Sequence, residues 1–297
     1  MNDLLKQLRE GDFKALARCI TIVENELEGY ASILSGLEFK KNVPVIGLTG
    51  PPGAGKSTLI NALLTYLTKQ NKKIGVIAID PTSPFNFGSL LGDRLRMSEH
   101  FESENIFIRS LATRGSLGGL SIKTIEVTDV MKAAGFDYIF IETVGVGQSE
   151  VEIAGLADTT ILVLAPGFGD EVQTIKSGIM EIGDIFVINK SDNPTAEGFA
   201  ISIKNLVESK MHEGWIPPVL KIIATQNEGI EMLYNKINEH TSSSFNTKKL
   251  FLLTEKAYKL IQNERMRNID KKKLQKEIEN KIKQPDFNLY KFVRNYS

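Results

Sequence analysis

The sequence of 297 residues has few of the residue types that build disulfide frameworks and metal clusters. Cys19 is its single cysteine and its three histidines are scattered, so we expect neither a disulfide framework nor a Cys/His zinc or iron–sulfur site. It contains no apolar run of about eighteen residues, so no membrane span is predicted. The N-terminus also lacks the apolar segment of a secretory signal. These absences predict a protein of the cytoplasm or of a comparable reducing compartment.

The charges balance in number but not in position, since 36 Lys and Arg residues face 36 Asp and Glu residues. Residues 247–297 carry 14 basic and 6 acidic side chains, a net charge of +8, whereas residues 1–246 carry 22 and 30, a net charge of −8. A basic C-terminal segment is found in proteins that bind nucleic acids or acidic partners. A solvated helical face is the simpler interpretation, and we expect neither a nucleic acid nor a membrane as the partner.

The spacing of apolar residues predicts an α/β fold. Residues 1–42 show helical spacing and predict two helices, and from Val43 onward short runs rich in Val and Ile alternate with helical patterns. Strands are predicted at 43–50, 73–80, 105–112, 138–145, 159–167, 184–192 and 219–225, and helices at 56–70, 121–134, 171–182, 195–212 and 229–240. Runs that are apolar on both faces are typical of buried parallel strands, so we predict a doubly wound, mostly parallel sheet.

Three segments follow from this pattern. Residues 1–42 form an N-terminal helical segment and residues 43–240 form the α/β domain. Residues 241–297 form a linker and a C-terminal helical segment, in which the serine-rich stretch 241–246 is the linker.

A complete phosphate-binding motif, G-x-x-x-x-G-K-[ST], follows the first predicted strand and opens a helix. Its residues are Gly50, Pro51, Pro52, Gly53, Ala54, Gly55, Lys56 and Ser57. Glycine allows backbone N–H groups to approach phosphates closely, and the helix N-terminus adds its dipole. We expect Lys56 at the β- and γ-phosphates, Ser57 on Mg²⁺ and Thr58 near the α-phosphate. The motif therefore predicts a nucleoside triphosphate site.

The sixth predicted strand ends in an N-K-x-D pattern formed by Asn189, Lys190 and Asp192. The Asp192 carboxylate is expected to accept hydrogen bonds from guanine N1 and N2, whereas adenine has no N1 donor. A buried acceptor left unpaired costs about 1–3 kcal/mol, which selects GTP over ATP by about 10- to 100-fold. Asn189 is expected to brace the loop and the Lys190 stem to cover the base. The Ala224 N–H is expected to meet guanine O6.

Three carboxylates are candidates for a magnesium site. Asp80 ends the second predicted strand and Glu142 lies in the fourth, and the carboxyl ends of parallel strands face the ligand-binding crevice. Mg²⁺ prefers oxygen ligands and retains water, so one or two carboxylates with Ser57 and the phosphates suffice. Asp93 is the third candidate, with a helix-capping or surface role as the alternative. Lys56 and these carboxylates are the predicted catalytic residues.

The residues after Glu142 suggest slow hydrolysis. Gly145 is placed to donate its N–H to the γ-phosphate, but Val146 follows it where Ras-like GTPases have the glutamine that orients water. We therefore expect a partner or a rearranged switch to raise the rate. The glycine-containing stretch 165–178 is interpreted as a contact surface, with an ordinary strand-to-helix loop as the alternative.

Four long motifs resemble the MeaB/ArgK family, which belongs to the SIMIBI class of P-loop GTPases and whose members are chaperones of methylmalonyl-CoA mutase. They are IDPTSPFNFGSLLGDRLRM (79–97), RSLATRGSLGGLS (109–121), IETVGVGQSEVEI (141–153) and PGFGDEVQTIKSGI (166–179). The resemblance covers about residues 1–285. It implies a homodimeric GTPase with N-terminal helices and a C-terminal helical dimerisation arm. Such a protein gates delivery of adenosylcobalamin to the mutase and helps to remove damaged cofactor.

The resemblance also assigns residues. It implies that Asp80, Asp93 and Glu142 surround Mg²⁺ and that the phosphate loop binds GTP or GDP. Asp170, Gln173 and Lys176 match a third switch that couples the partner to the nucleotide site, and adenosylcobalamin is expected only on the partner. The chain departs from the family at Ile223, where a serine is usual, and in its lysine-rich C-terminal arm.

Alternatives from other classes remain open. A nickel-insertion GTPase has similar motifs but generally carries Cys/His metal segments. A P-loop kinase conflicts with the N-K-x-D pattern, and a GTP-binding scaffold that does not hydrolyse GTP would show no turnover. Within the leading interpretation, methylmalonyl-, ethylmalonyl- and isobutyryl-CoA mutases are all possible partners.

Overall fold

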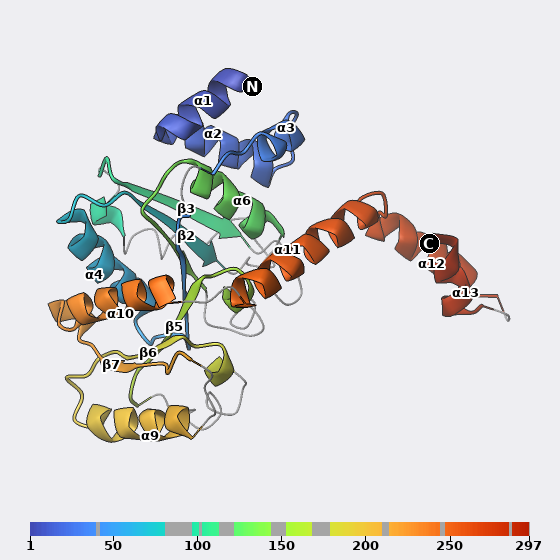
Figure 1. Cartoon of the computed structure of the whole chain (residues 1–297). Coiled ribbons are helices and arrows are strands. Elements are labelled where there is room, and N and C mark those ends of the chain that lie inside the picture. Colours follow the sequence, from blue (N-terminus) through green and yellow to red (C-terminus); the bar gives the residue numbers. More distant parts are fainter. Residues whose placement is uncertain are drawn as a thin grey trace. The chain divides into compact units, whose positions relative to one another are not determined.

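The computed structural model describes residues 1–39, 42–80, 97–100, 103–112, 122–143, 153–167, 179–209, 214–243, 247–284 and 287–296. They form two compact units, Met1–Leu253 and Thr254–Ser297. Figure 1 shows a sheet with helices in the first unit and only helical elements in the described part of the second. The predicted division at residues 42 and 240 stays a prediction.

The first unit is built on a seven-stranded parallel sheet in the order β3-β2-β4-β1-β5-β6-β7. Its strands are β1 (Val45–Thr49), β2 (Ile74–Asp80), β3 (Ile106–Ala112), β4 (Tyr138–Glu142), β5 (Thr159–Leu164), β6 (Ile185–Ile188) and β7 (Val219–Lys221). Every predicted strand forms inside its predicted run, which confirms the parallel α/β fold. The chain crosses from one half of the sheet to the other at β1, so ligands are expected at its carboxyl end.

Helices cover both faces of the sheet, as predicted for a doubly wound fold (Figure 1). On one face, α4 (Lys56–Thr68) and α10 (Ile230–Ser243) pack on alternate residues of β1 and β5. On the other, α6 (Ile122–Ala133) and α9 (Ala196–Glu208) cover the remaining residues. The N-terminal helices share the apolar core of α6. Burial on both faces explains why the strands are continuously apolar.

Three helices form at the N-terminus, so the prediction of two was wrong. They are α1 (Asn2–Glu10), α2 (Phe13–Glu24) and α3 (Tyr30–Ser35). Gly11 ends α1 with a φ of 81°, and the Asp12 carboxylate caps α2 by accepting from Ala15 N at 2.6 Å. The additional helix, α3, starts after Gly29, which has a φ of 90°. Its six residues are too few to show a helical period in the sequence.

The predicted linker 241–246 is partly wrong, because α10 continues through Ser243. Thr241 Oγ1 donates to Ile237 O at 2.6 Å, so its hydroxyl is satisfied within the helix. Residues 244–246 lie outside the described residues. The first eight residues of the predicted helix 171–182 also lie outside them, and in its described part Ile179–Glu181 form a short 3₁₀ turn. Similar turns form at Ser98–His100, Ile153–Gly155 and Ala224–Gln226.

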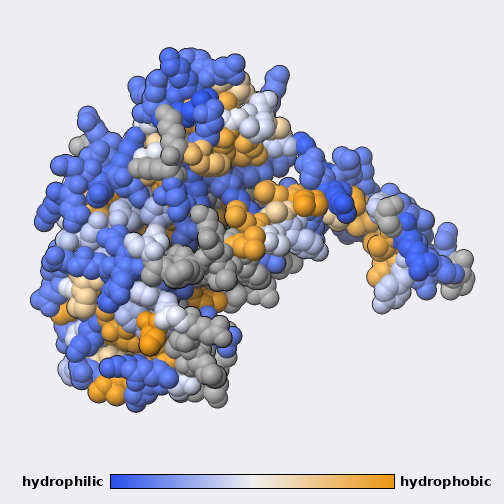
Figure 2. Space-filling view, in the orientation of Figure 1, coloured by the Kyte–Doolittle hydropathy of each residue, from blue (hydrophilic) through white to orange (hydrophobic). Residues whose placement is uncertain are grey.

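The C-terminal segment is helical, as predicted. It consists of α11 (Thr247–Met266), α12 (Lys271–Lys281), α13 (Leu289–Val293) and a final turn, Arg294–Tyr296. Several large apolar side chains of α11 are exposed, among them Tyr258 at 64% and Ile261 at 54%. Figure 2 shows hydrophobic residues at the surface of the C-terminal helices. Asp270 caps α12 by accepting from Lys272 N at 2.8 Å. Within the described part of the chain, no helix combines the length and the apolar character needed to cross a membrane.

Cys19 of α2 offers a test of this fold because its side chain is completely buried in the apolar core that α2 shares with α6. Burial raises the pKa of its thiol to about 11, although the charge of Arg18 opposes the shift. Since the thiolate is the reactive form, the native protein should react with a thiol reagent at pH 8 about 100-fold or more slowly than the unfolded chain. Labelling in buffer and in denaturant measures this ratio. Equal rates would contradict the packing of α2.

Candidate nucleotide-binding site

The phosphate-binding motif forms the loop between β1 and α4, as predicted. Gly50, Gly53 and Gly55 have φ values of 138°, 78° and 90°, which glycine adopts without strain. A Cβ atom on Gly50 would lie 2.0 Å from Val163 O, and one on Gly55 would lie 2.3 Å from Asn189 Nδ2. The loop therefore requires glycine at these two positions for space as well as for conformation.

The two polar residues that open α4 are buried and bonded to the protein itself. Lys56 Nζ donates to Gly50 O at 2.8 Å and to Pro51 O at 3.2 Å. Ser57 Oγ donates to Glu142 Oε1 at 2.7 Å. The side chains of Lys56, Ser57 and Glu142 are all buried. Thr58 follows at the third position of α4 and is partly exposed.

Two of the three predicted carboxylate residues, Glu142 and Asp80, end strands at the same edge of the sheet as the loop. Glu142 is the last residue of β4 and stands in register with Leu48 of β1 and Ala78 of β2. Asp80 is the last residue of β2 and pairs with Ala112 of β3. The side chain of Asp80 and the residues Asp93 and Gly145 lie outside the described structure.

The Ser57–Glu142 pair fits a magnesium ion that is shared with a nucleotide. It offers two buried oxygen ligands directly beside the phosphate loop. Among the residues that the structure describes, no group of three or more His, Cys, Asp and Glu would hold a metal alone. A Mg²⁺ ion that takes its other ligands from phosphates and water needs no such group.

Asn189 joins the phosphate loop to the loop after β7. Its side chain is buried, and Nδ2 donates to Ala54 O at 3.0 Å and to Gly55 O at 3.5 Å. Its Oδ1 accepts from Ala224 N at 3.2 Å. The predicted bracing role of Asn189 thus has a geometric basis, because one amide is bonded to two loops that are far apart in the sequence.

Lys190 and Asp192 are exposed beside this buried amide. Lys190 has a φ of 56°, which turns the chain away from β6. Ser191 between them fixes the turn, since its N–H donates to Ile222 O at 3.1 Å and its Oγ donates to Ile188 O at 2.6 Å. The sequence pattern did not reveal this role of Ser191.

The loop after β7 is shaped mainly by backbone bonds. Ile223 N donates to Glu228 O and Glu228 N donates to Ile223 O, both at 3.2 Å. Gly229 closes the loop with a φ of 81°. These bonds do not depend on the side chain at position 223, so they remain where the family's usual serine is replaced by isoleucine. Because Ala224 N donates to Asn189, binding of guanine O6 by this N–H requires an exchange of that bond.

The third predicted switch, Asp170, Gln173 and Lys176, lies outside the described residues. The structure thus brings together Lys56, Ser57 and Glu142 at the phosphate end, and Asn189 and Ala224 at the base end. It places Asp80 at the phosphate edge by register and leaves Lys190 and Asp192 exposed beside the base loop.

A comparison with protein families matches residues 16–283 to the methylmalonyl-CoA mutase-associated GTPase MeaB. The chain belongs to this family. A Pyrococcus abyssi protein named as a GTPase is 51% identical over 245 residues, which cover 81% of this chain and 76% of that protein. The GTPase ArgK of Escherichia coli is 38% identical, over 78% of this chain and 73% of its own length. The mitochondrial methylmalonic aciduria type A homolog of Mus musculus is 42% identical, over 65% of this chain and 48% of its own length.

Solved structures show the same fold. A LAO/AO transport system kinase matches with a TM-score of 0.68 and 24% identity over 99% of this chain and 95% of its own. HypB from Helicobacter pylori in complex with nickel matches with a TM-score of 0.52 and 16% identity over 78% of this chain and 99% of its own. At these identities the matches support the fold alone. Membership in the MeaB family confirms the resemblance found in the sequence and identifies the enzyme as a guanine-nucleotide-binding GTPase.

Two glycines with positive φ, Gly55 and Gly135, allow the effect of backbone strain to be measured apart from that of a collision with Asn189. Gly55→Ala and Gly135→Ala both place a side chain on backbone of positive φ, but a Cβ at Gly135, with a φ of 76°, meets nothing within 4 Å. Backbone strain should lower the free energy of unfolding by about 1–2 kcal/mol in each variant, and Gly55→Ala should lose more stability because its Cβ also displaces the buried Asn189 amide. Only Gly55→Ala should also lower GTP affinity, by about 10-fold or more, because it displaces a buried amide with three hydrogen bonds. Thermal unfolding and GTP titration measure the two effects. Equal loss of affinity in both variants would contradict this account.

Proposed function

We propose that this GTPase binds Mg²⁺–GTP across the phosphate and base loops and acts as a nucleotide-dependent chaperone of an adenosylcobalamin-dependent acyl-CoA mutase. The observation that carries the binding site is the Asn189 amide, which joins the phosphate loop to Ala224. The mutase as a partner is supported by the family, whose description associates it with methylmalonyl-CoA mutase.

At the phosphate end, Lys56 exchanges its bonds to Gly50 O and Pro51 O for phosphate oxygens. This exchange is favourable because charge-assisted bonds to phosphate are stronger than bonds to neutral carbonyl groups. Ser57 and Glu142 hold Mg²⁺, with Asp80 and Asp93 as further oxygen ligands. When bound, the metal neutralises charge on the phosphates. Gly145 N donates to the γ-phosphate.

At the base end, Asp192 accepts from guanine N1 and N2, and the Lys190 stem covers the ring. The exposure of both side chains beside the buried Asn189 supports this assignment, because an incoming base finds them at the surface. Asn189 sets the spacing between the two loops before the base arrives, and guanine O6 then takes the place of Asn189 Oδ1 at Ala224 N–H while the bond to Ala54 O is kept.

The partner interactions rest on other regions. Asp170, Gln173 and Lys176 couple the mutase to the nucleotide site, and adenosylcobalamin is bound by the mutase alone. The C-terminal helices form a homodimer, a role supported by the exposed Tyr258 and Ile261 of α11. We place the protein in the cytoplasm.

Asp192→Asn tests guanine recognition. Loss of the carboxylate removes the acceptor for guanine N1 and N2, so GTP affinity should fall by about 10- to 100-fold while the weak affinity for ATP stays unchanged. Binding of both nucleotides is measured by fluorescence titration. Glu197→Gln is a matched control, because it neutralises an exposed carboxylate that pairs with Lys221 of β7. A variant that discriminates between GTP and ATP as the native protein does would contradict the assignment.

GTP hydrolysis with and without a purified adenosylcobalamin-dependent methylmalonyl-CoA mutase tests the chaperone function. We expect GTP turnover to be slow alone and at least about tenfold faster with the mutase, with no turnover of ATP. Lys56→Ala should abolish both rates because the phosphates lose their buried cation. GTP turnover that the mutase does not change would leave the GTPase intact and contradict this choice of partner.

A further inference from the structure

Among the residues that the structure describes, β3 is the edge of the sheet and pairs with β2 alone, so backbone bonds hold it on one side. Its register with β2 runs from Ile74↔Ile106 to Asp80↔Ala112. The last register pair places Ala112, at the end of β3, beside Asp80, at the end of β2. An edge strand has fewer backbone bonds than a central one, so side-chain contacts on its other side contribute more to its position.

The N-terminal helices supply such a contact through an ion pair. Glu24, the last residue of α2, accepts from Arg109 Nη2 of β3. The pair is largely buried, with side-chain exposures of 12% for Glu24 and 24% for Arg109. Within the described structure, Arg109 Nε is buried without a hydrogen-bond acceptor, so the guanidinium depends strongly on this carboxylate. Arg109 precedes Ala112 by three residues, or about 10 Å along the strand.

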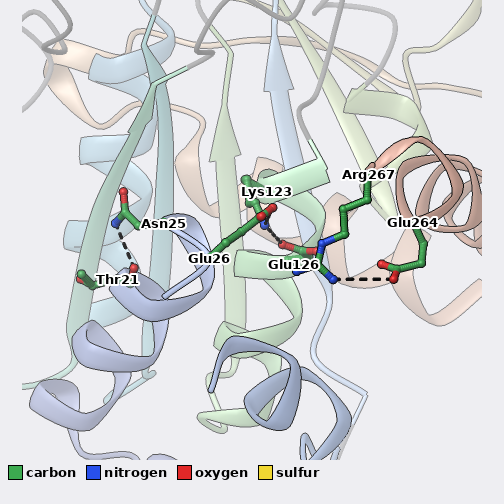
Figure 3. Close-up of polar contacts among 7 residues, drawn as sticks. All are labelled: Thr21, Asn25, Glu26, Lys123, Glu126, Glu264 and Arg267. Carbon is green, nitrogen blue, oxygen red and sulfur yellow. Dashed lines mark hydrogen bonds and ion pairs between the residues drawn. The ribbon is translucent and has the colours of Figure 1, made fainter. Parts of the chain in front are cut away.

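A second ion pair extends from the same turn. Glu26 Oε1 lies 2.9 Å from Nζ of Lys123, the second residue of α6, and Lys123 Nζ donates to Glu126 Oε2 at 2.7 Å (Figure 3). Burial alone would lower the pKa of Lys123, but its bonds to Glu126 and Glu26 outweigh burial and raise it. The turn is itself capped, since Asn25 Nδ2 donates to Thr21 O at 2.9 Å (Figure 3).

The two ion pairs connect one turn of the N-terminal layer to two consecutive elements of the sheet domain. Glu24 contacts β3 and Glu26 contacts α6, the next element along the chain. In a doubly wound fold a strand ends, and the following helix begins, at the edge where ligands bind. The turn 24–26 is therefore tied to the edge of the sheet where the metal end of the site is proposed, although it belongs to no strand of that sheet.

We propose that Glu24 is a positioning residue for magnesium-dependent nucleotide binding. Its ion pair with Arg109 fixes the carboxyl end of β3 and, through the Asp80↔Ala112 pair, the end of β2 that carries a magnesium carboxylate. Glu26 assists by fixing the first turn of α6. The inference rests on the proposed function, because it requires Asp80 to serve the metal.

The test measures GTP affinity as a function of Mg²⁺ concentration, with a fluorescent GTP analogue and the full chain. Glu24→Gln should raise by about three- to tenfold the Mg²⁺ concentration that gives half of the metal-dependent gain in GTP affinity. The GTP affinity measured in EDTA should stay at the native value. Glu26→Gln should have a smaller effect, because Lys123 keeps its ion pair with Glu126. Glu38→Gln is the matched control: Glu38 pairs with Arg9 in the same layer, at exposures of 61% and 29%, and neither residue belongs to the sheet domain.

A double-mutant cycle identifies the ion pair as the cause. Arg109→Gln should reproduce the shift of Glu24→Gln, and the double variant should show no larger shift than either single change. Additive effects would overturn the inference. So would an equal loss of affinity with Mg²⁺ and in EDTA, which indicates a general loosening of the fold.

The remaining outcomes separate the two proposals. If the native protein binds the analogue independently of Mg²⁺, both the metal assignment and this inference fail. If the native protein is Mg²⁺-dependent and Glu24→Gln behaves as native, only this inference fails. Folding of Glu24→Gln is judged by fluorescence of the single tryptophan, Trp215. If that variant does not fold, Glu24→Asp replaces it, because aspartate keeps the negative charge on a side chain too short to hold Arg109 in the same position. An unchanged Mg²⁺ dependence in that variant overturns the inference.

Discussion

The proposed nucleotide site depends on one buried amide. Asn189 donates to Ala54 O and accepts from Ala224 N, so it fixes the distance between a loop that follows the central strand and a loop that follows an edge strand. A buried amide that lost these partners would cost about 1–3 kcal/mol for each unmade bond. The glycine at position 55 follows from the same constraint, because any larger residue would occupy the place of Asn189 Nδ2. The most restrictive residue of the base motif therefore acts on the phosphate loop.

The phosphate end is bonded internally in the structure. Lys56 donates to two loop carbonyl groups and Ser57 donates to Glu142, so these three side chains have hydrogen-bond partners before a ligand arrives. Binding therefore exchanges hydrogen bonds instead of creating them, and the gain comes from replacing neutral acceptors by charged phosphate oxygens. The cation of Lys56 and the carboxylate of Glu142 are both buried here, which makes the site favour a ligand that carries phosphate and metal together.

The sequence predicted the strands and the phosphate loop because local signals encode both. Strands that are buried on two faces are continuously apolar, and the glycines of the loop are required by φ and by space. Local sequence signals did not predict elements that are very short or whose ends are set by bonds to neighbouring residues. The six residues of α3 are too few for a helical period, and the serine-rich stretch after His240 continues α10 because Thr241 bonds back into the helix. The Ser57–Glu142 and Asn189–Ala224 bonds join distant segments, so the sequence indicated the residues but not their pairing.

Both ends of the proposed site lie beside strands that pair on one side only within the described part of the chain. At the base end, β7 has three residues, and its following loop is fixed by Ser191 N donating to Ile222 O and by the Asn189 amide. At the metal end, β3 is fixed by Arg109 and its partner Glu24. The central strand β1 needs no such support, because β4 and β5 flank it. Contacts with groups outside the strand pairing thus support the two outer strands, and at β3 the proposed support comes from Glu24 of the N-terminal helices.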